Sequence, residues 1–105
     1  MRDMEAVSLR FVSVARVLAD EAQAQGWRAP AFRSPPRLVG VGRSIVRRSD
    51  GGCTVSVALR GRPWAAVLSD LIEGVVVTNR LRGVDADRCR ARLWQRLGEA
   101  GEEAA

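Results

Sequence analysis

The dipeptide Asp50-Gly51 constrains the fold more than any other feature of the sequence, because it separates two runs of strand-forming residues. Asp-Gly tolerates the positive φ angles of a tight type I′ turn, so residues 43–60 are predicted to form a β-hairpin. With Asp50 and Gly51 as the loop, Ser49 lies opposite Gly52. One face of the hairpin is then mostly apolar and the other is mostly cationic.

The turn decides which side chains share a face, because side chains alternate between the two faces of a sheet. A two-residue loop predicts an inward face that contains Ser44, Val46, Arg48, Cys53, Val55, Val57 and Leu59. It predicts an outward cationic face that contains Arg43, Ile45, Arg47, Thr54, Ser56, Ala58 and Arg60. A four-residue loop keeps this register, whereas a three-residue loop slips one strand and exchanges the faces.

The chain before the hairpin predicts a helix and an extended connector. Residues 4–25 carry apolar side chains at three- and four-residue spacing, and Asp3 suits the N-cap of such a helix. Gly26 suits the left-handed position that ends a helix. Residues 28–42 contain three prolines and few helix formers, which favours an extended, polyproline-like connection.

The chain after the hairpin predicts two helices. Pro63 suits the first position of a helix whose apolar residues continue to about Leu81. A β-branched run leaves an alternative, a short β-α-β unit with residues 75–79 as a third strand. Asp85 or Asp87 is expected to cap the last helix.

These segments together predict a small α+β fold: an N-terminal helix, a proline-containing connector, a β-hairpin and a C-terminal helical hairpin packed on the hairpin. The helices are expected to cover the apolar face, because a two-stranded hairpin alone is marginally stable. Residues 1–98 are predicted to form a single globular domain, and residues 99–105 an acidic, flexible tail.

Positive charge is concentrated in the middle third of the chain. Residues 28–62 hold eight Arg and one acid (+7), residues 1–27 hold three Arg and four acids (−1), and residues 63–105 hold six Arg and seven acids (−1), which gives the total of +5. Such a concentration favours a polyanion, a membrane surface or an acidic protein as partner. Every basic residue is an arginine, which partly reflects GC-rich codon usage. Each arginine is therefore weaker evidence for a binding function.

The composition argues against catalysis, metals and cofactors. The chain has no His and no Tyr, so it lacks the commonest general base and the commonest metal ligand. Asp70 and Glu73 share a helix face, but no partner acid or base can be named for them. Cys53 and Cys89 form no CxxC motif and are expected to be reduced, buried thiols. No catalytic or metal-binding residue and no cofactor is assigned.

The location predicted from the sequence is the cytoplasm, without membrane association. Charged residues interrupt the first apolar segment, unlike a secretory signal, and no apolar run is long enough to span a bilayer.

The leading hypothesis for function is a nucleic-acid-binding protein without enzymatic activity, with DNA as a candidate ligand. Guanidinium groups of the hairpin region would contact the phosphate backbone, and the predicted residues are Arg37, Arg43, Arg47, Arg48, Arg60 and Arg62.

The alternative hypothesis is a homodimer or accessory protein-interaction subunit, whose basic region meets an acidic protein surface. Trp64, Val76 and Val77 would lie in the interface. A symmetric dimer could join two hairpins into a four-stranded sheet and so cover their edges.

Overall fold

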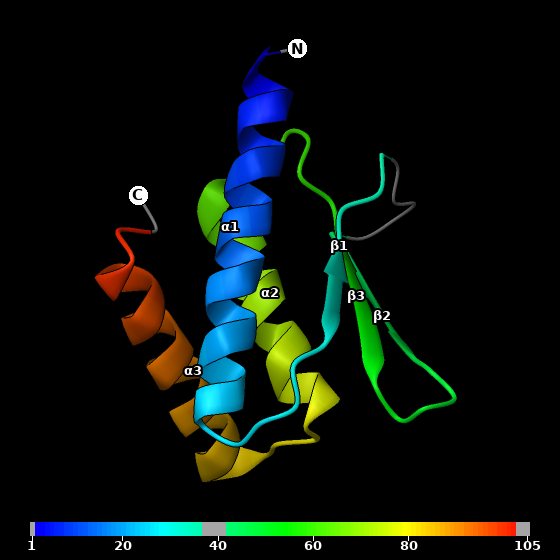
Figure 1. Ribbon diagram of the computed structural model, residues 1–105, viewed down its shortest axis with the longest axis vertical. Coiled ribbons are helices and arrows are strands. Elements are labelled where there is room, and N and C mark those ends of the chain that lie inside the picture. The colour runs from blue at the N-terminus through cyan, green and yellow to red at the C-terminus, as the bar shows by residue number, and fades with distance from the viewer. Residues whose placement is uncertain (1, 37–41, 103–105) are drawn as a thin grey trace.

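The structure of the protein is a computed structural model that describes residues 2–36 and 42–102. Within these ranges the chain forms three helices and one three-stranded sheet (Figure 1). In chain order the elements are α1 (Arg2–Ala24), β1 (Ala31–Arg33), β2 (Arg43–Arg47), β3 (Cys53–Val57), α2 (Trp64–Thr78) and α3 (Gly83–Glu99). The predicted α+β arrangement, with one helix before the sheet and two after it, is confirmed.

The sheet has the order β1-β3-β2, with β3 in the centre. β2 and β3 are antiparallel, as expected for a hairpin, whereas β1 pairs with β3 in parallel. The third strand therefore comes from the proline-containing connector. The alternative with residues 75–79 as a strand is wrong, because Val75 and Val76 are buried on the helical face of α2. Burial of that face outweighs the modest preference of β-branched residues for strands.

The hairpin turn has a three-residue loop, Ser49 to Gly51, rather than the predicted two-residue loop. The amide of Arg48 donates to the carbonyl of Gly52 (2.7 Å), and the amide of Gly51 donates to the carbonyl of Arg48 (3.0 Å). Gly51 has a φ of 87°, the left-handed conformation that such a loop requires at its last position. Asp50 further stabilises the turn, since its Oδ1 accepts the Gly52 amide at 2.8 Å.

This turn slips β2 by one residue, so Ile45 pairs with Val55 and Arg47 with Cys53. The prediction for β3 was right, because Cys53, Val55 and Val57 point inward and are buried. The prediction for β2 was wrong: Arg43, Ile45 and Arg47 share the inward face, and Val46 is 58% exposed on the other. Arg43 and Arg47, which were expected on the outward face, therefore lie on the side of the sheet that faces α2.

The helices cover one face of the sheet, and α2 is the helix in direct contact with β2 and β3. α1 and α3 pack against α2 and against each other, away from the sheet (Figure 1). Among the described elements no helix lies on the other face of the sheet. The core contains Phe11, Val14, Leu18, Val55, Val57, Leu68, Leu71, Ile72, Val75, Cys89, Leu93 and Leu97.

The helix boundaries differ from the expected ones by a few residues. α2 begins after Pro63 and ends at Thr78 rather than near Leu81. α3 has Arg82 as its N-cap, and Asp85, one of the two expected caps, lies in its first turn. None of the helices in the described part of the chain is both long and apolar enough to cross a bilayer.

Gly74 allows α2 to approach the centre of the sheet closely. A Cβ atom added there would lie 2.9 Å from both Cγ atoms of Val55. Such a distance is shorter than a carbon–carbon contact of about 3.5 Å, so the helix or the strand would have to move. The missing side chain thus sets the distance between α2 and β3.

We expect Gly74→Ala to destabilise the protein by about 1 kcal/mol, because overpacking outweighs the gain in helix propensity. Gly98→Ala in α3 is the matched control: its added Cβ meets no atom within 4 Å, so it should be neutral or stabilising. Urea unfolding of both variants measures the difference. A smaller loss of stability from Gly74→Ala in a Val55→Ala background would confirm that the added methyl group meets Val55. Equal stabilisation by both glycine replacements would contradict it.

Candidate functional site

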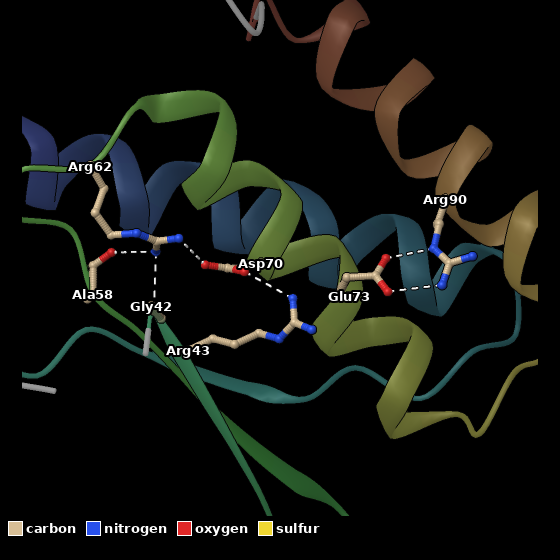
Figure 2. Close-up of polar contacts among 7 residues, drawn as sticks. All are labelled: Gly42, Arg43, Ala58, Arg62, Asp70, Glu73 and Arg90. Atoms are coloured by element: carbon tan, nitrogen blue, oxygen red, sulfur yellow. Dashed lines mark hydrogen bonds and ion pairs between the residues drawn. The ribbon is translucent and has the colours of Figure 1, made fainter. Parts of the chain in front are cut away.

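The predicted phosphate-binding arginines do not lie together, and two of them contact a buried acid. Arg43 Nη1 lies 3.0 Å from Asp70 Oδ1, and Arg62 Nη2 lies 2.6 Å from Asp70 Oδ2 (Figure 2). The Asp70 side chain is only 12% exposed. Two guanidinium groups from the sheet region thus neutralise one carboxylate on α2.

Arg62 also links the two ends of the hairpin. Its Nη1 donates to the carbonyl oxygens of Gly42 (3.2 Å) and Ala58 (2.9 Å), as Figure 2 shows. The guanidinium lies so close to Gly42 that an added Cβ would overlap it. Arg43 and Arg62 therefore connect the hairpin to α2, and each has an Asp70 carboxylate oxygen as a partner.

Replacing Asp70 tests this role. Asp70→Asn should destabilise the protein by about 2 kcal/mol, because it leaves two partly buried guanidinium groups without their counter-charge. Asp20→Asn is the control, since Asp20 is exposed on α1 and should change stability by less than about 0.5 kcal/mol. Thermal or urea unfolding at neutral pH measures both, and equal stability of the two variants would show that the Asp70 contacts contribute little.

A second group of arginines surrounds the tip of the hairpin. Arg28, from the connector, donates Nη2 to the carbonyl of Asp50 at 3.2 Å. Arg47 donates Nη1 to the next carbonyl, that of Gly51, at 3.2 Å, and Nη2 to Val77 O at 3.3 Å. Arg48 pairs with the Asp50 carboxylate at 3.3 Å. Three guanidinium groups and one carboxylate therefore meet around a single turn.

Asp50 remains ionised beside these arginines. The hydrogen bond from the Gly52 backbone amide lowers the pKa of its carboxyl most, followed by the hydrogen bond and the charge of Arg48 and then by the charge of Arg28. The carboxylate cancels only one of the three neighbouring positive charges. The tip therefore keeps a net positive charge.

Asn79, just after α2, fixes Arg28 next to the tip. Its side-chain Oδ1 accepts the Arg28 amide at 2.7 Å, and its Nδ2 donates to the Arg28 carbonyl at 2.8 Å. The next residue, Arg80, is exposed. We call Arg28, Arg47, Arg48 and Arg80, together with Asp50, the cationic end. All five residues are exposed, and they come from three separate segments of the chain.

Sequence reasoning missed Arg28 and Arg80 as members of this surface. Each follows the end of a helix, and the Asn79 hydrogen bonds join their two segments across 51 positions of the sequence. Of the other predicted arginines, Arg60 is exposed in the turn after β3. Arg37 lies outside the described residues.

The three predicted interface residues have different environments. Trp64 is half-buried, and the Arg10 guanidinium lies 4.4 Å from the centre of its ring. Arg10 in turn pairs with Glu102 at 2.9 Å. Val76 is buried in the core at 4% exposure, whereas Val77 is 40% exposed. Of the three, only Val77 presents a large part of its side chain at the surface.

Two further ion pairs connect the helices. Arg90 of α3 binds both oxygens of Glu73 on α2, at 2.7 and 3.0 Å (Figure 2). Arg92 binds Glu21 of α1, a residue that is only 7% exposed, at 2.9 Å. The hydrogen bond from Arg90 lowers the pKa of Glu73, so this carboxyl is an ion-pair partner and a poor proton donor at neutral pH.

Glu21 predicts a pH dependence of stability. The hydrogen bond from Arg92 lowers its pKa most, so the folded pKa lies below the ordinary value of 4.5. The stabilisation is complete above pH 4.5 and is lost as the pH falls through the folded pKa. Glu21→Gln should lower the free energy of unfolding by about 1–3 kcal/mol at neutral pH, because it removes hydrogen bonds to a charged group.

The stability difference between wild type and Glu21→Gln should therefore shrink as the pH is lowered below about 4.5. Urea unfolding at a series of pH values measures it, with Glu5→Gln, an exposed position on α1, as the control. A difference that does not change with pH would contradict the role of the ionised carboxylate.

Both cysteines are free and buried. Burial, with a smaller contribution from the charge of Glu73, raises the pKa of Cys89 to about 11. The Cys89 thiol is therefore protonated at neutral pH, and a protonated thiol is a weak nucleophile. In the described ranges no three Asp, Glu or Cys side chains converge as metal ligands would.

Comparison of the chain with protein-family models, with curated proteins and with solved structures finds no match. The argument for function therefore depends on the chemistry of the chain's own surface.

Proposed function

We propose that the protein is a non-enzymatic nucleic-acid-binding protein of the cytoplasm, and that the cationic end contacts the phosphate backbone. The observation that carries the proposal is the convergence of three exposed arginines, Arg28, Arg47 and Arg48, around the turn that bears the Asp50 carboxylate. Guanidinium groups pair bidentately with phosphate oxygens, and the release of condensed counterions favours each contact.

The arginines at the tip are positioned in advance for such contacts. Arg28 and Arg47 each donate to a carbonyl of the turn, which restricts their side chains while other N–H groups of each guanidinium remain for a ligand. Restricting a side chain before binding reduces the entropy lost on binding. This surface replaces the predicted set in part, since Arg47 and Arg48 belong to it and Arg43 and Arg62 do not.

The free state of Cys53 and Cys89 supports the cytoplasmic location, because thiols stay reduced in that compartment.

A homodimer joined at the sheet edge is the second candidate, and the position of β2 favours it. β2 is an edge strand, and hydrogen bonds Arg48 N to Gly52 O and Ala58 N to Gly42 O place the backbone groups of Arg43, Ile45 and Arg47 outward. An antiparallel pair centred on Ile45 would place Arg43 of each copy opposite Arg47 of the other. Such like-charge pairs are destabilising, so we rank this candidate below nucleic-acid binding.

Neutralising the cationic end should weaken binding of labelled nucleic acid. We expect a variant with Arg28, Arg48 and Arg80 replaced by Gln to bind at least about tenfold more weakly at low salt, with a salt slope smaller by about 0.7–0.9 per lost phosphate contact. The matched control replaces Arg16, Arg33 and Arg88, which are exposed elsewhere, by Gln and removes the same charge. Fluorescence anisotropy between about 50 and 200 mM salt measures both.

The outcome separates a local site from a general charge effect. Equal weakening by the two triple variants would show that only net charge matters, and no binding at low salt would reject the proposal. A mass of two chains by light scattering, rather than the 11.4 kDa of one, would then favour the homodimer.

A further inference from the structure

The hairpin tip has the shape of a narrow projection. In Figure 1 the turn between β2 and β3 extends away from the helices, beyond the start of the short strand β1. Its residues, Ser49 to Gly52, have small side chains or none. Because neighbouring strands lie about 4.8 Å apart, such a ribbon fits the major groove of B-form DNA, which is about 12 Å wide.

The arginines next to the tip lie on both faces of the ribbon. Arg47 shares the inward face with Cys53 and reaches Val77 at the end of α2. Arg48 turns along β3 and donates to Thr54 Oγ1 at 3.2 Å, on the face that no described helix covers. A groove of a duplex has phosphates along both walls, so guanidinium groups on both faces of an inserted ribbon are suitably placed to meet them.

The aromatic residues argue against a single-stranded ligand. Phe11 is buried, and Trp27, Phe32, Trp64 and Trp94 are half-buried against the core. The five aromatic residues of the chain all lie in its described part, and none belongs to the cationic end. Proteins that bind single strands generally stack the bases on exposed aromatic rings, which contribute about 1–3 kcal/mol per base. This surface lacks that contribution.

The Asp50 carboxylate favours insertion of the tip into a groove over contact with the outer side of the sugar-phosphate backbone. It lies at the extreme of the tip, where it would repel a phosphate but could accept a hydrogen bond from the cytosine amino group in the major groove. Hydrogen bonds from Gly52 and Arg48 fix its position. The major groove of an RNA duplex is too deep and narrow for side chains to read.

From these observations we infer that the ligand is double-stranded DNA and that the hairpin tip enters its major groove. The inference rests on the proposed function and assigns the substrate class and the docking mode of the same surface. Arg47 and Arg48 then contact the two walls of the groove, and Arg28 and Arg80 contact the backbone beside it.

The test compares the affinity of the 105-residue chain for a DNA duplex, for either of its separated strands, and for the RNA duplex of the same sequence. We expect the DNA duplex to bind at least about tenfold more tightly than the others at low salt. A second DNA duplex carries glucosylated 5-hydroxymethylcytosine, whose sugars occupy the major groove and leave the minor groove unchanged. Binding to this duplex should fall by at least about tenfold.

A variant with a new charge at the tip provides an independent measurement. Ser49→Glu should weaken binding to the unmodified duplex at least about fivefold, whereas Ser69→Glu, an exposed position in the middle of α2, should change it less than about twofold. Both positions are exposed, so neither change should unfold the protein, which circular dichroism checks.

The outcomes distinguish the inference from the proposed function. Tighter binding of single strands, or equal binding of plain and glucosylated duplexes, would overturn the inference and leave nucleic-acid binding intact. Failure of all the nucleic acids to bind would overturn both.

Discussion

The contact of Asp70 with Arg43 and Arg62 is the interaction on which the arrangement of the sheet and α2 depends. One carboxylate on α2 receives guanidinium groups from the start of β2 and from the turn after β3. A buried carboxylate requires such neutralisation, because removal from water makes an unpaired charge costly. Close packing at Gly74 and Val55 completes the alignment of helix and strand. The charge contact specifies where the hairpin lies, and the apolar contact specifies how closely it approaches.

The arginines of this chain include two groups, those that pair with carboxylates between elements and those that are exposed around the hairpin tip. Arg62, Arg90 and Arg92 join separate parts of the fold through carboxylates that are largely buried. The planar guanidinium group suits this role because it can bind carboxylate and carbonyl oxygens at the same time. The arginines of the cationic end have mainly backbone carbonyls as partners and face solvent. The two kinds are not distinguishable by composition, so counting charges along the sequence does not separate Arg43 and Arg62 from the arginines of the cationic end.

The sequence predicted the elements better than their registers. Asp50-Gly51, Gly26 and Pro63 correctly indicated the hairpin, the end of α1 and the start of α2, since each reflects a local backbone preference. The predicted register of β2 was wrong because Asp-Gly is compatible with a two-residue and with a three-residue loop. Which loop forms depends on how Gly51 and Gly52 hydrogen-bond to Arg48. β1 was missed as a strand because its three residues are extended in either case and only pairing with β3 makes them a strand. The cationic end required Asn79 to join two segments that no local pattern relates.

The parallel pairing of β1 has a consequence for the order in which the sheet can form. β2 and β3 are joined by a short turn, so their contacts close a small loop and lose little chain entropy. β1 can reach β3 only after the chain has crossed from one edge of the sheet to the other, because β2 follows β1 in sequence and lies on the far side of β3. We therefore expect the hairpin to form first and β1 to dock on it afterwards.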